Sequence, residues 1–347
     1  FEIPTSRIMC SVNLTGLGVL FWLLIVSFGL GSMQAKDAHE LNRLLGTGVN
    51  LGNALDAPSE GDWGVVLEER YFELVKQVGF DSVRIPVRWS NHAKDSQPYT
   101  ILESFFQRVE WAIDQALKND LAAVVNVHHY SELFESPAQH TERFLELWKQ
   151  IAVRFKNLPE SVFFEVLNEP NTNLKTDEWN SLIPQALAVI RESNPHRIVI
   201  LGSPNWNNVD WLPQLKLPED DRRLIVTFHY YSPHQFTHQS TPWSEPRFRD
   251  LSGIKWLGTD REKAAVRKDF SIAVDYAKQH DRPLFMGEYG VYEAVDMESR
   301  IRWTSFVSDE ARRLGMSTSY WEFCASFGLY DLKANTWREG LLEAVLP

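Results

Sequence analysis

The sequence predicts an α/β protein whose folded part is a single (β/α)8 barrel, and three observations support this. Eight short apolar runs alternate with longer amphipathic stretches between residues 36 and 347. Several of the runs, such as AAVVNV and VFFEVL, are apolar almost throughout, as parallel strands buried on both faces are. No linker rich in Ser, Gly or Pro interrupts the stretch. Eight strands, each followed by a helix or helix-like connection, are the arrangement of a (β/α)8 barrel.

The eight runs define the expected strands in chain order. They are Gly48–Gly52, Ser82–Arg88, Ala122–His129, Val162–Glu169, Ile198–Pro204, Leu224–Tyr231, Pro283–Gly290 and Ser317–Phe323. A doubly wound open sheet is the alternative. It is disfavoured because the first run, GVNLG, is not the phosphate-binding G-x-G-x-x-G, and no Walker sequence occurs.

The stretches between the runs carry apolar residues at positions i, i+3, i+4 and i+7, which predicts amphipathic helices. These are Val66–Val78, Ile101–Lys118, Glu142–Phe155, Asp177–Arg191, Arg261–Lys278 and Glu298–Arg313. Thr176, Asp177 and Asp260 are expected as helix N-caps, since their side chains accept from backbone N–H groups. Only the connection after the fifth strand has little helical signal.

The first 35 residues are excluded from the fold. Between Arg7 and Lys36 there is no charged residue, and Leu17–Leu30 is continuously apolar or small. Its length fits the secretory core of roughly 7–15 residues better than a spanning helix of about 20. We therefore expect 1–35 to be a signal peptide with cleavage near Ala35, and 36–347 to be a secreted catalytic domain. An uncleaved membrane anchor is the alternative.

Charge and cysteine content exclude several classes of partner. The chain has 35 Lys and Arg against 46 Asp and Glu, a net charge of −11. No basic patch for nucleic acid or an anionic membrane is present in the sequence. Two cysteines cannot form a disulfide framework or a Cys-rich zinc site. We expect no metal, no cofactor and no protein partner.

Polar residues stand at the ends of the expected strands, where barrel enzymes carry their active sites. Glu169 and Glu288 end two strands inside apolar runs, and burying a carboxylate is costly unless it is paired. Two facing carboxylates suit glycoside hydrolysis, in which one protonates the leaving oxygen and the other attacks or activates water. The other polar residues at strand ends are Arg84, His128, His129, Asn168, His229, Tyr231, Trp321 and Glu322.

Two neighbouring pairs differ in what they can do. His128 and His129 are adjacent, so they point to opposite faces of a strand unless the strand end bends. This argues against a two-histidine metal site. His229 and Tyr231 are two apart and share a face. Three tryptophans in the loops after strands five and six are candidate platforms for sugar rings; they are Trp206, Trp211 and Trp243.

At these residues the sequence resembles glycoside hydrolase family 5, the retaining (β/α)8 cellulases and mannanases. The motifs GVNLGNAL, GFDSVRIPVRW, VVNVHHY, FFEVLNEP, VTFHYYSP, FMGEYG and YWEF occur in the family's order from about Gly46 to Leu346. The resemblance implies an endo-acting retaining hydrolase of β-1,4-glucan, with a polysaccharide as its partner. A β-mannanase or dual glucanase/mannanase is the alternative. A sugar-binding barrel without catalysis and a membrane-tethered enzyme acting on its own cell's glycan are also considered.

The resemblance also implies roles for individual residues. Glu169 would be the general acid/base and Glu288 the nucleophile. The remaining residues would assist as follows: Arg84 and Tyr231 bind the nucleophile, His229 positions the acid/base, Asn168 binds the sugar 2-hydroxyl, His128 contacts that sugar, and Trp321 stacks beneath it, before a cis peptide bond. The positions that would line the cleft are Asn53, His129, His238, Trp243 and Glu322. Asp56 departs from the family's glutamate, which concerns substrate preference rather than chemistry.

Overall fold

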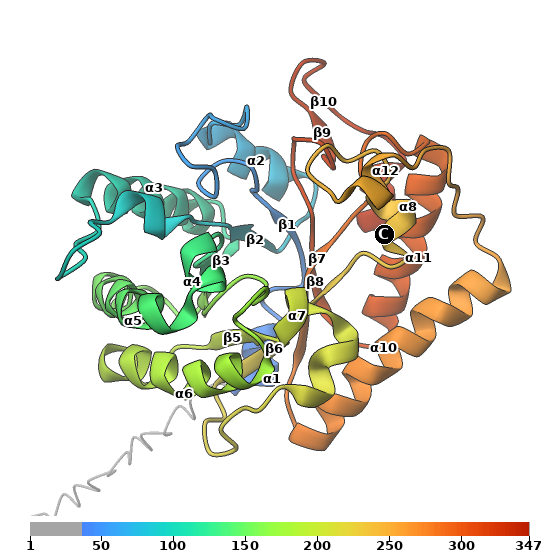
Figure 1. The fold of residues 1–347 in the computed structure, drawn as a ribbon. Coiled ribbons are helices and arrows are strands. Elements are labelled where there is room, and N and C mark those ends of the chain that lie inside the picture. Colours follow the sequence, from blue (N-terminus) through green and yellow to red (C-terminus); the bar gives the residue numbers. More distant parts are fainter. Residues whose placement is uncertain (1–36, 347) are drawn as a thin grey trace, which may run out of the picture. The chain divides into compact units, whose positions relative to one another are not determined.

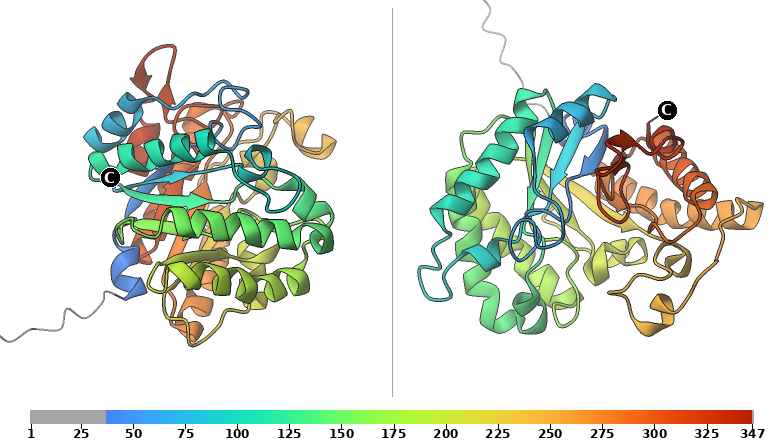
Figure 2. Two further views of the ribbon diagram at one scale, coloured as in Figure 1. Left: turned by 90° about the vertical axis from the view of Figure 1, so that its left-hand side faces the viewer. Right: turned by 90° about the horizontal axis from the view of Figure 1, so that it is seen from above.

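The computed structural model describes residues 37–346, which form a closed barrel of eight parallel strands in the order β1 to β8 (Figures 1 and 2). The predicted (β/α)8 fold is confirmed. The predicted export or anchor segment, 1–35, lies outside the described residues. The strands are β1 Thr47–Asn50, β2 Ser82–Ile85, β3 Ala122–Asn126, β4 Val162–Glu165, β5 Val199–Gly202, β6 Leu224–Tyr230, β7 Leu284–Tyr289 and β8 Ser317–Tyr320.

Helices surround the strands, with α3, α5 and α6 on one side and α10 and α11 on the other in Figure 1. Their apolar faces pack on the outer faces of the strands in one large core. The main helices are α2 Glu69–Gln77, α3 Glu103–Lys118, α5 Pro137–Arg154, α6 Thr176–Ser193, α10 Asp260–His280 and α11 Met297–Arg313. The short elements are α1 Ala38–Asn42, η1 Trp89–His92, α4 Ser131–Glu135, α7 Pro204–Asn207, η2 Val209–Gln214, α8 His234–Thr237, α9 Pro246–Arg249, the hairpin β9 Tyr330–Asp331 with β10 Thr336–Trp337, and α12 Leu341–Val345.

The predicted N-caps are wrong by one or two positions. Helix α10 is capped by Thr259, whose hydroxyl accepts from the backbone N–H of Glu262 while the Glu262 carboxylate accepts from Thr259. This reciprocal pair satisfies two N–H groups, which Asp260 alone would not do. Helix α6 begins after Lys175, so Thr176 and Asp177 lie in its first turn, where an acidic side chain favours the helix dipole.

The strands end earlier than the apolar runs predict. Strands β3 and β4 stop at Asn126 and Glu165, and beyond them the backbone pairs through single bonds. One is His128 N–H to the Val87 carbonyl at 2.8 Å, and another is Asn168 N–H to Val127 at 2.9 Å. After β3 and β4 the chain therefore leaves the regular ladder just before its polar residues, which lie in loops of the barrel mouth, whereas His229 and Glu288 remain within β6 and β7.

The barrel interior changes from apolar to polar along its axis. Helix α1 contributes Leu41 to an apolar cluster inside the amino-terminal end, together with residues such as Phe163 and Phe285. The next inward-facing positions are polar, because strand side chains alternate with a period of two. They are Asn50 of β1, Arg84 of β2, Asn126 of β3 and Glu165 of β4, all without exposed surface.

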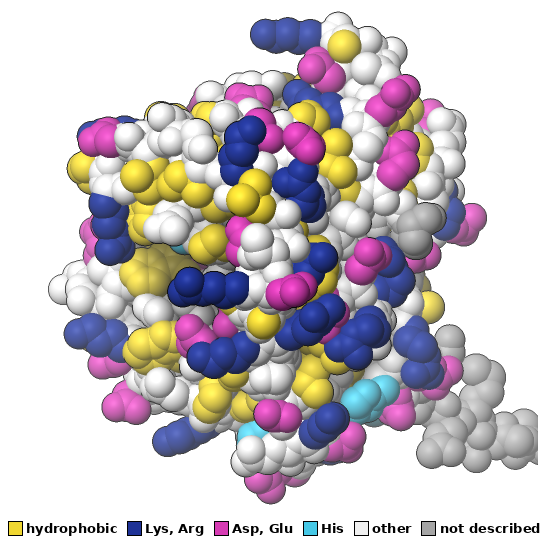
Figure 3. Space-filling model, turned by 90° about the vertical axis from the view of Figure 1, so that its right-hand side faces the viewer, with side chains coloured by type: hydrophobic (Ala, Val, Ile, Leu, Met, Phe, Trp, Pro, Cys, Tyr) yellow, Lys and Arg dark blue, Asp and Glu magenta, His cyan; other side chains and the backbone are white. Residues whose placement is uncertain are grey.

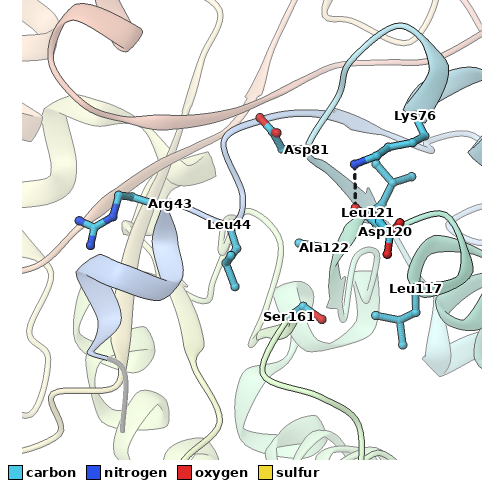
Figure 4. A pocket seen from close by; sticks show the side chains of 9 residues that line it. All are labelled: Arg43, Leu44, Lys76, Asp81, Leu117, Asp120, Leu121, Ala122 and Ser161. Atoms are coloured by element: carbon cyan, nitrogen blue, oxygen red, sulfur yellow. Dashed lines mark hydrogen bonds between the residues drawn. The ribbon is translucent and has the colours of Figure 1, made fainter. Parts of the chain in front are cut away.

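A separate hollow of about 400 Å³ lies at the amino-terminal ends of β2 and β3 (Figure 4). Lys76 Nζ donates to the Asp120 carbonyl across it at 2.9 Å. This end of a barrel serves stability rather than chemistry. The face that carries α10 and α11 shows positive and negative side chains interspersed among small apolar patches (Figure 3). In the described part of the chain, none of the helices combines the length and apolar character needed to cross a membrane.

Candidate active site

Two glutamates face each other at the carboxyl end of the barrel. Glu288 lies in β7 and is 5% exposed, whereas Glu169 follows β4 and keeps a quarter of its side chain exposed. A carboxylate oxygen of one lies within 4.8 Å of a carboxylate oxygen of the other. Glu169 has a φ of +47°, a left-handed conformation that costs about 1–3 kcal/mol for a residue with a side chain. Asn171 Nδ2 donates to its carbonyl at 2.7 Å and supports this conformation.

Glu288 is held by two donors. Arg84 Nη1 donates to Oε1 at 2.7 Å, and the Tyr231 hydroxyl donates to Oε2 at 2.8 Å. His128 Nε2 lies 4.0 Å from Oε1. Burial raises the pKa of Glu288; His229, whose Nδ1 lies 3.5 Å from Oε2, opposes that rise, as do the charge of Arg84 and the hydrogen bond from Tyr231. These donors favour the ionised form that a nucleophile needs.

Glu169 has a different environment. Its Oε1 lies 2.7 Å from Nδ1 of His229. Burial raises the pKa of Glu169 to about 7, against the opposing charge of Arg84. Burial also lowers the pKa of His229 to about 4, so the imidazole is neutral near pH 7. The amide Nδ2 of Asn207 faces its Nε2 at 3.3 Å, which leaves the ring proton on Nδ1, next to Glu169.

Arg84 connects the two halves of the site from a fully buried position. Its guanidinium donates twice to Glu165, at 2.6 and 2.8 Å, and once each to Asn50 Oδ1 at 2.8 Å and Asn168 Oδ1 at 2.7 Å. Burial disfavours its charge, but the carboxylates of Glu165 and Glu288 outweigh this and raise the pKa of Arg84 above its ordinary value. It therefore remains a fixed cation beneath the glutamates.

One wall of the site is aromatic. The rings of His128 and Trp321 are parallel, with centroids 5.6 Å apart and an interplanar angle of 5°. A Cβ atom on Gly52 would lie 2.7 Å from the Trp321 ring, so only glycine allows this approach. The peptide bond Trp321–Glu322 is cis, as expected.

Both adjacent histidines reach this wall, which corrects the expectation that only one would. The rings of His128 and His129 meet edge to face at 4.6 Å, and Trp63 meets His129 in the same way at 5.6 Å. The reason is that β3 ends at Asn126, so strand alternation no longer applies to residues 128 and 129.

Two of the residues expected to line the cleft, Glu322 and Asn53, form hydrogen bonds within their own loops. Glu322 has no exposed surface, and its carboxylate accepts from the backbone N–H groups of Cys324, Ala325 and Phe327 at 2.7–3.0 Å. It thus holds the following loop, and its placement as a residue that lines the cleft is wrong. Asn53 has a φ of +65° and its backbone N–H donates to Asp56 Oδ2 at 3.1 Å.

His238 and Trp243 lie in the loop after β6. The His238 ring meets Tyr231 edge to face at 4.8 Å, so it borders the glutamate site. Trp243 is 60% exposed and packs against Tyr292 at 5.3 Å. An exposed indole beside the site is suited to stacking on a sugar.

Two clusters of described residues place three candidate metal ligands within 4.8 Å of one another: Asp56 with His128 and His129, and Glu169 with His229 and Glu288. In the first, Asp56 accepts from two backbone N–H groups, and His128 Nδ1 faces the Asn126 amide at 3.0 Å. The second cluster is the glutamate pair with its histidine.

Sequence reasoning missed the polar layer beneath the glutamates. Glu165, Asn50 and Asn126 lie within apolar runs and Asn207 lies in a loop, so only Arg84 of this layer is expected from the sequence. A signal was present: Glu165 lies four residues before Glu169 in an otherwise apolar run, and an inward-facing charge there requires a partner.

A second hollow, of about 540 Å³, lies at the loop that follows Glu169, where Asn171 and Thr172 line it. Its walls also include Lys175 and the indoles of Trp206 and Trp211. The Trp206 backbone N–H donates to the Pro170 carbonyl at 3.1 Å, and its side chain is 51% exposed. Of the three tryptophans expected as platforms for sugar rings, Trp206 and Trp211 thus line this hollow.

A (β/α)8 barrel with two closely spaced glutamates at its mouth, one bound to arginine and tyrosine and one to histidine, defines the architecture of the retaining glycoside hydrolases. Within that class, the chain belongs to glycosyl hydrolase family 5, because the family's cellulase model matches residues 46–326.

Several known proteins are similar to this chain. Endoglucanase H of Acetivibrio thermocellus is 38% identical over 294 residues, which are 84% of this chain and 31% of that protein. The chain thus spans about a third of that relative's length. Thermotoga maritima Cel5A, solved in complex with mannotriose and with cellobiose, is 46% identical with a TM-score of 0.88, covering 89% of this chain and 100% of that one. The cellulose synthase subunit Z of Clostridioides difficile is 36% identical with a TM-score of 0.84, covering 87% and 99%.

Proposed function

We propose that the protein is an endo-acting glycoside hydrolase that cleaves β-1,4-glucan with retention of configuration. The observation that carries this proposal is the close approach of two carboxyl groups with different surroundings. Retaining enzymes have their carboxyl groups about 5–5.5 Å apart and inverting enzymes about 6.5–9.5 Å apart. An oxygen–oxygen approach within 4.8 Å favours retention.

In the proposed reaction, Glu288 Oε attacks the anomeric carbon while Glu169 gives its proton to the leaving glycosidic oxygen. A glycosyl ester on Glu288 forms and the shortened chain departs. Glu169, now ionised, removes a proton from water as the water attacks the anomeric carbon and releases Glu288. Ester formation removes the negative charge of Glu288, which otherwise raises the pKa of Glu169, so the acid can act as a base in the second step.

The other residues would act on the sugar or on the glutamates. Arg84 and Tyr231 stabilise ionised Glu288, and neutral His229 donates to Glu169. Asn168, oriented by Arg84, is available to the 2-hydroxyl of the sugar that reacts. The Trp321 ring, parallel to that of His128, would stack on that sugar.

The substrate class follows from relatives and from the open site. Endoglucanase H and the cellobiose complex of Cel5A favour glucan. The mannotriose complex of Cel5A makes mannan the second substrate to test. The hollow at the loop after Glu169, lined by Trp206 and Trp211, would receive a chain that continues past the acid, as endo-action requires.

The test is release of reducing ends from soluble carboxymethyl-cellulose and from mannan by the wild type, Glu288→Gln and Tyr276→Phe. Tyr276 is the control, because its hydroxyl bonds only the Leu215 carbonyl on the outer layer. We expect glucan cleavage by the wild type and the control and a loss of about 10⁴-fold or more in Glu288→Gln. Glucan cleavage by folded Glu288→Gln at the wild-type rate would disprove the assignment.

The amino-terminal segment carries a separate proposal: Leu17–Leu30 directs export, and the glucan is met outside the cytoplasm. Mass determination of the mature amino terminus tests it. A terminus near residue 36 supports cleavage, and retention of residues 17–30 in a membrane fraction supports the anchor.

A further inference from the structure

We propose that Glu165 is a positioning residue of the active site: it fixes the Arg84 guanidinium against Glu288 and Asn168, and its negative charge offsets that of Arg84 beneath the two glutamates. The inference rests on the proposed roles of Glu169 and Glu288. It concerns a buried third carboxylate in the barrel, which the proposed reaction does not use.

Glu165 holds Arg84 through both carboxylate oxygens. Arg84 Nε donates to Oε2 at 2.6 Å and Nη2 donates to Oε1 at 2.8 Å, and neither side chain has exposed surface. Two parallel bonds between a guanidinium and a carboxylate fix the plane of the guanidinium as well as its position. Asn126 Nδ2 also approaches Oε2, at 3.4 Å, and steadies the carboxylate from β3.

This orientation determines what the rest of Arg84 can reach. Nε and Nη2 of Arg84 form the edge of the guanidinium that binds Glu165. Nη1 then points at Glu288 Oε1, 2.7 Å away, and Nη2 also donates to Asn168 Oδ1 at 2.7 Å. A guanidinium released from Glu165 could rotate about its side-chain bonds. The donor to the nucleophile and the support of Asn168 would then be lost together.

Besides holding Arg84 in position, Glu165 adds a negative charge near Glu169 and Glu288. The ionisable groups that face Glu169 and Glu288 come from four strands and their ends: Arg84, Glu165, His128, His229 and Tyr231. Arg84 is the only permanent cation among them. By itself it would favour ionisation of both glutamates.

The negative charge of Glu165, which contacts Arg84 directly, offsets part of the positive charge of Arg84. The same negative charge also acts on Glu169 in the direction that raises the pKa, after the larger effect of burial. The direct bond from Arg84 to Glu288 remains in place. The arrangement thus stabilises ionised Glu288 through contact while it limits the long-range effect of Arg84 on Glu169.

The experiment compares wild type, Glu165→Gln, Glu165→Asp and the control Glu310→Gln. Glu310 is also a buried carboxylate, on α11, and accepts from Arg313 and Arg267 away from the site. The measurements are kcat and KM on soluble β-glucan, the pH profile of kcat/KM, and carbon-13 titration of the Glu169 carboxyl in the unliganded enzyme.

In Glu165→Gln we expect kcat to fall about 100-fold with KM changed less than about threefold, because the misplaced groups act in the transition state. The alkaline limb of the kcat/KM profile and the midpoint of the Glu169 titration should both move about one pH unit lower, because the negative charge of Glu165 is removed. Glu165→Asp retains the charge but loses reach. It should keep both titrations at the wild-type pH and lose about tenfold in kcat.

A folded Glu165→Gln with wild-type kcat and an unmoved Glu169 titration overturns the proposal. Glu165→Gln could fail to fold because Arg84 loses its bidentate partner. In that case Glu165→Asp provides the test: an unchanged kcat in Glu165→Asp overturns the proposal, and so does a shift of the Glu169 titration in Glu165→Asp. Loss of activity in Glu310→Gln to the same extent also overturns it. Failure of the proposed function would appear differently, as no glucan or mannan cleavage by the wild type, and the Glu169 titration would still test Glu165.

Discussion

Nδ1 of His229 lies 2.7 Å from Oε1 of Glu169, and its ring is neutral near pH 7 because burial lowers the pKa of His229 to about 4. A neutral imidazole donates a hydrogen bond without adding a charge that would ionise Glu169. The acid therefore keeps the raised pKa that burial gives it, about 7. This contact is the basis for the expected pH dependence of the reaction.

The first prediction is a bell-shaped pH profile with its maximum below pH 7. The rate should fall as pH rises through about 7, because Glu169 loses the proton it must donate, and should fall on the acid side as Glu288 becomes protonated. The measurement is kcat/KM on soluble β-glucan from pH 4 to 9. An aryl cellobioside with an acidic phenol needs little protonation, so its alkaline limb should be weaker. Activity that is flat between pH 6 and 9 on glucan would contradict the assignment of the acid.

The second prediction concerns Tyr231→Phe, which removes the donor at 2.8 Å from Glu288 Oε2. Loss of one donor to the nucleophile should lower kcat by about 10–100-fold. It should also move the acid limb to higher pH, because the ionised form of Glu288 loses a hydrogen bond while burial still raises its pKa. Tyr276→Phe is the matched control and should change neither. An acid limb that moves to lower pH in Tyr231→Phe would be inconsistent with this contact.

The fold could be predicted from the sequence, and so could the positions of Glu169 and Glu288 at strand ends, because both follow from a local pattern. Apolar runs predict buried strands, and polar residues at their ends predict the barrel mouth. The pattern could not predict where β3 and β4 leave the ladder. That depends on neighbouring backbone, such as the Val87 carbonyl that pairs with His128.

The part that sequence reasoning missed is the interior polar layer. Glu165 interrupts an apolar run in the sequence, but its partner Arg84 lies 81 positions away, so only the closed barrel brings them together. Glu322 was misplaced for a related reason. Its oxygens accept hydrogen bonds from backbone N–H groups of the loop after it, and the residue types alone do not predict the path of that loop.

The third prediction concerns stability. Burial raises the pKa of Glu322 to about 7 in the folded protein, well above the ordinary value that holds in the unfolded chain. The folded state then binds a proton more tightly than the unfolded one, so the free energy of unfolding falls as pH rises from about 4.5 to 7. The contribution of Glu322 over that interval is on the order of 3 kcal/mol at most.

The check is thermal melting between pH 5 and 7.5 for wild type, Glu322→Gln and the control Glu310→Gln. The neutral Gln has no proton to lose, so its melting temperature should depend less on pH than that of the wild type. At pH 5, Glu322→Gln should be less stable than the wild type. One oxygen that accepts from backbone N–H groups is replaced by an amide NH2 group, which can only donate, so a buried N–H group loses its acceptor. A wild-type slope in Glu322→Gln would count against a raised pKa for Glu322.

The fourth prediction tests the leaving-group side. The Trp206 backbone N–H donates to the carbonyl of Pro170, the residue after Glu169, and the Trp206 side chain is half-exposed. A sugar that stacks there is lost to Trp206→Ala, and stacking on an aromatic ring contributes roughly 1 kcal/mol. We expect KM for cellohexaose to rise about 5–10-fold, while an aryl cellobioside, which places only its aryl leaving group on that side, loses less in kcat/KM. Trp111→Ala, on the outer helix α3, serves as the control for loss of an indole. Equal losses on both substrates would mean that Trp206 supports Glu169 through the loop instead of binding the departing chain.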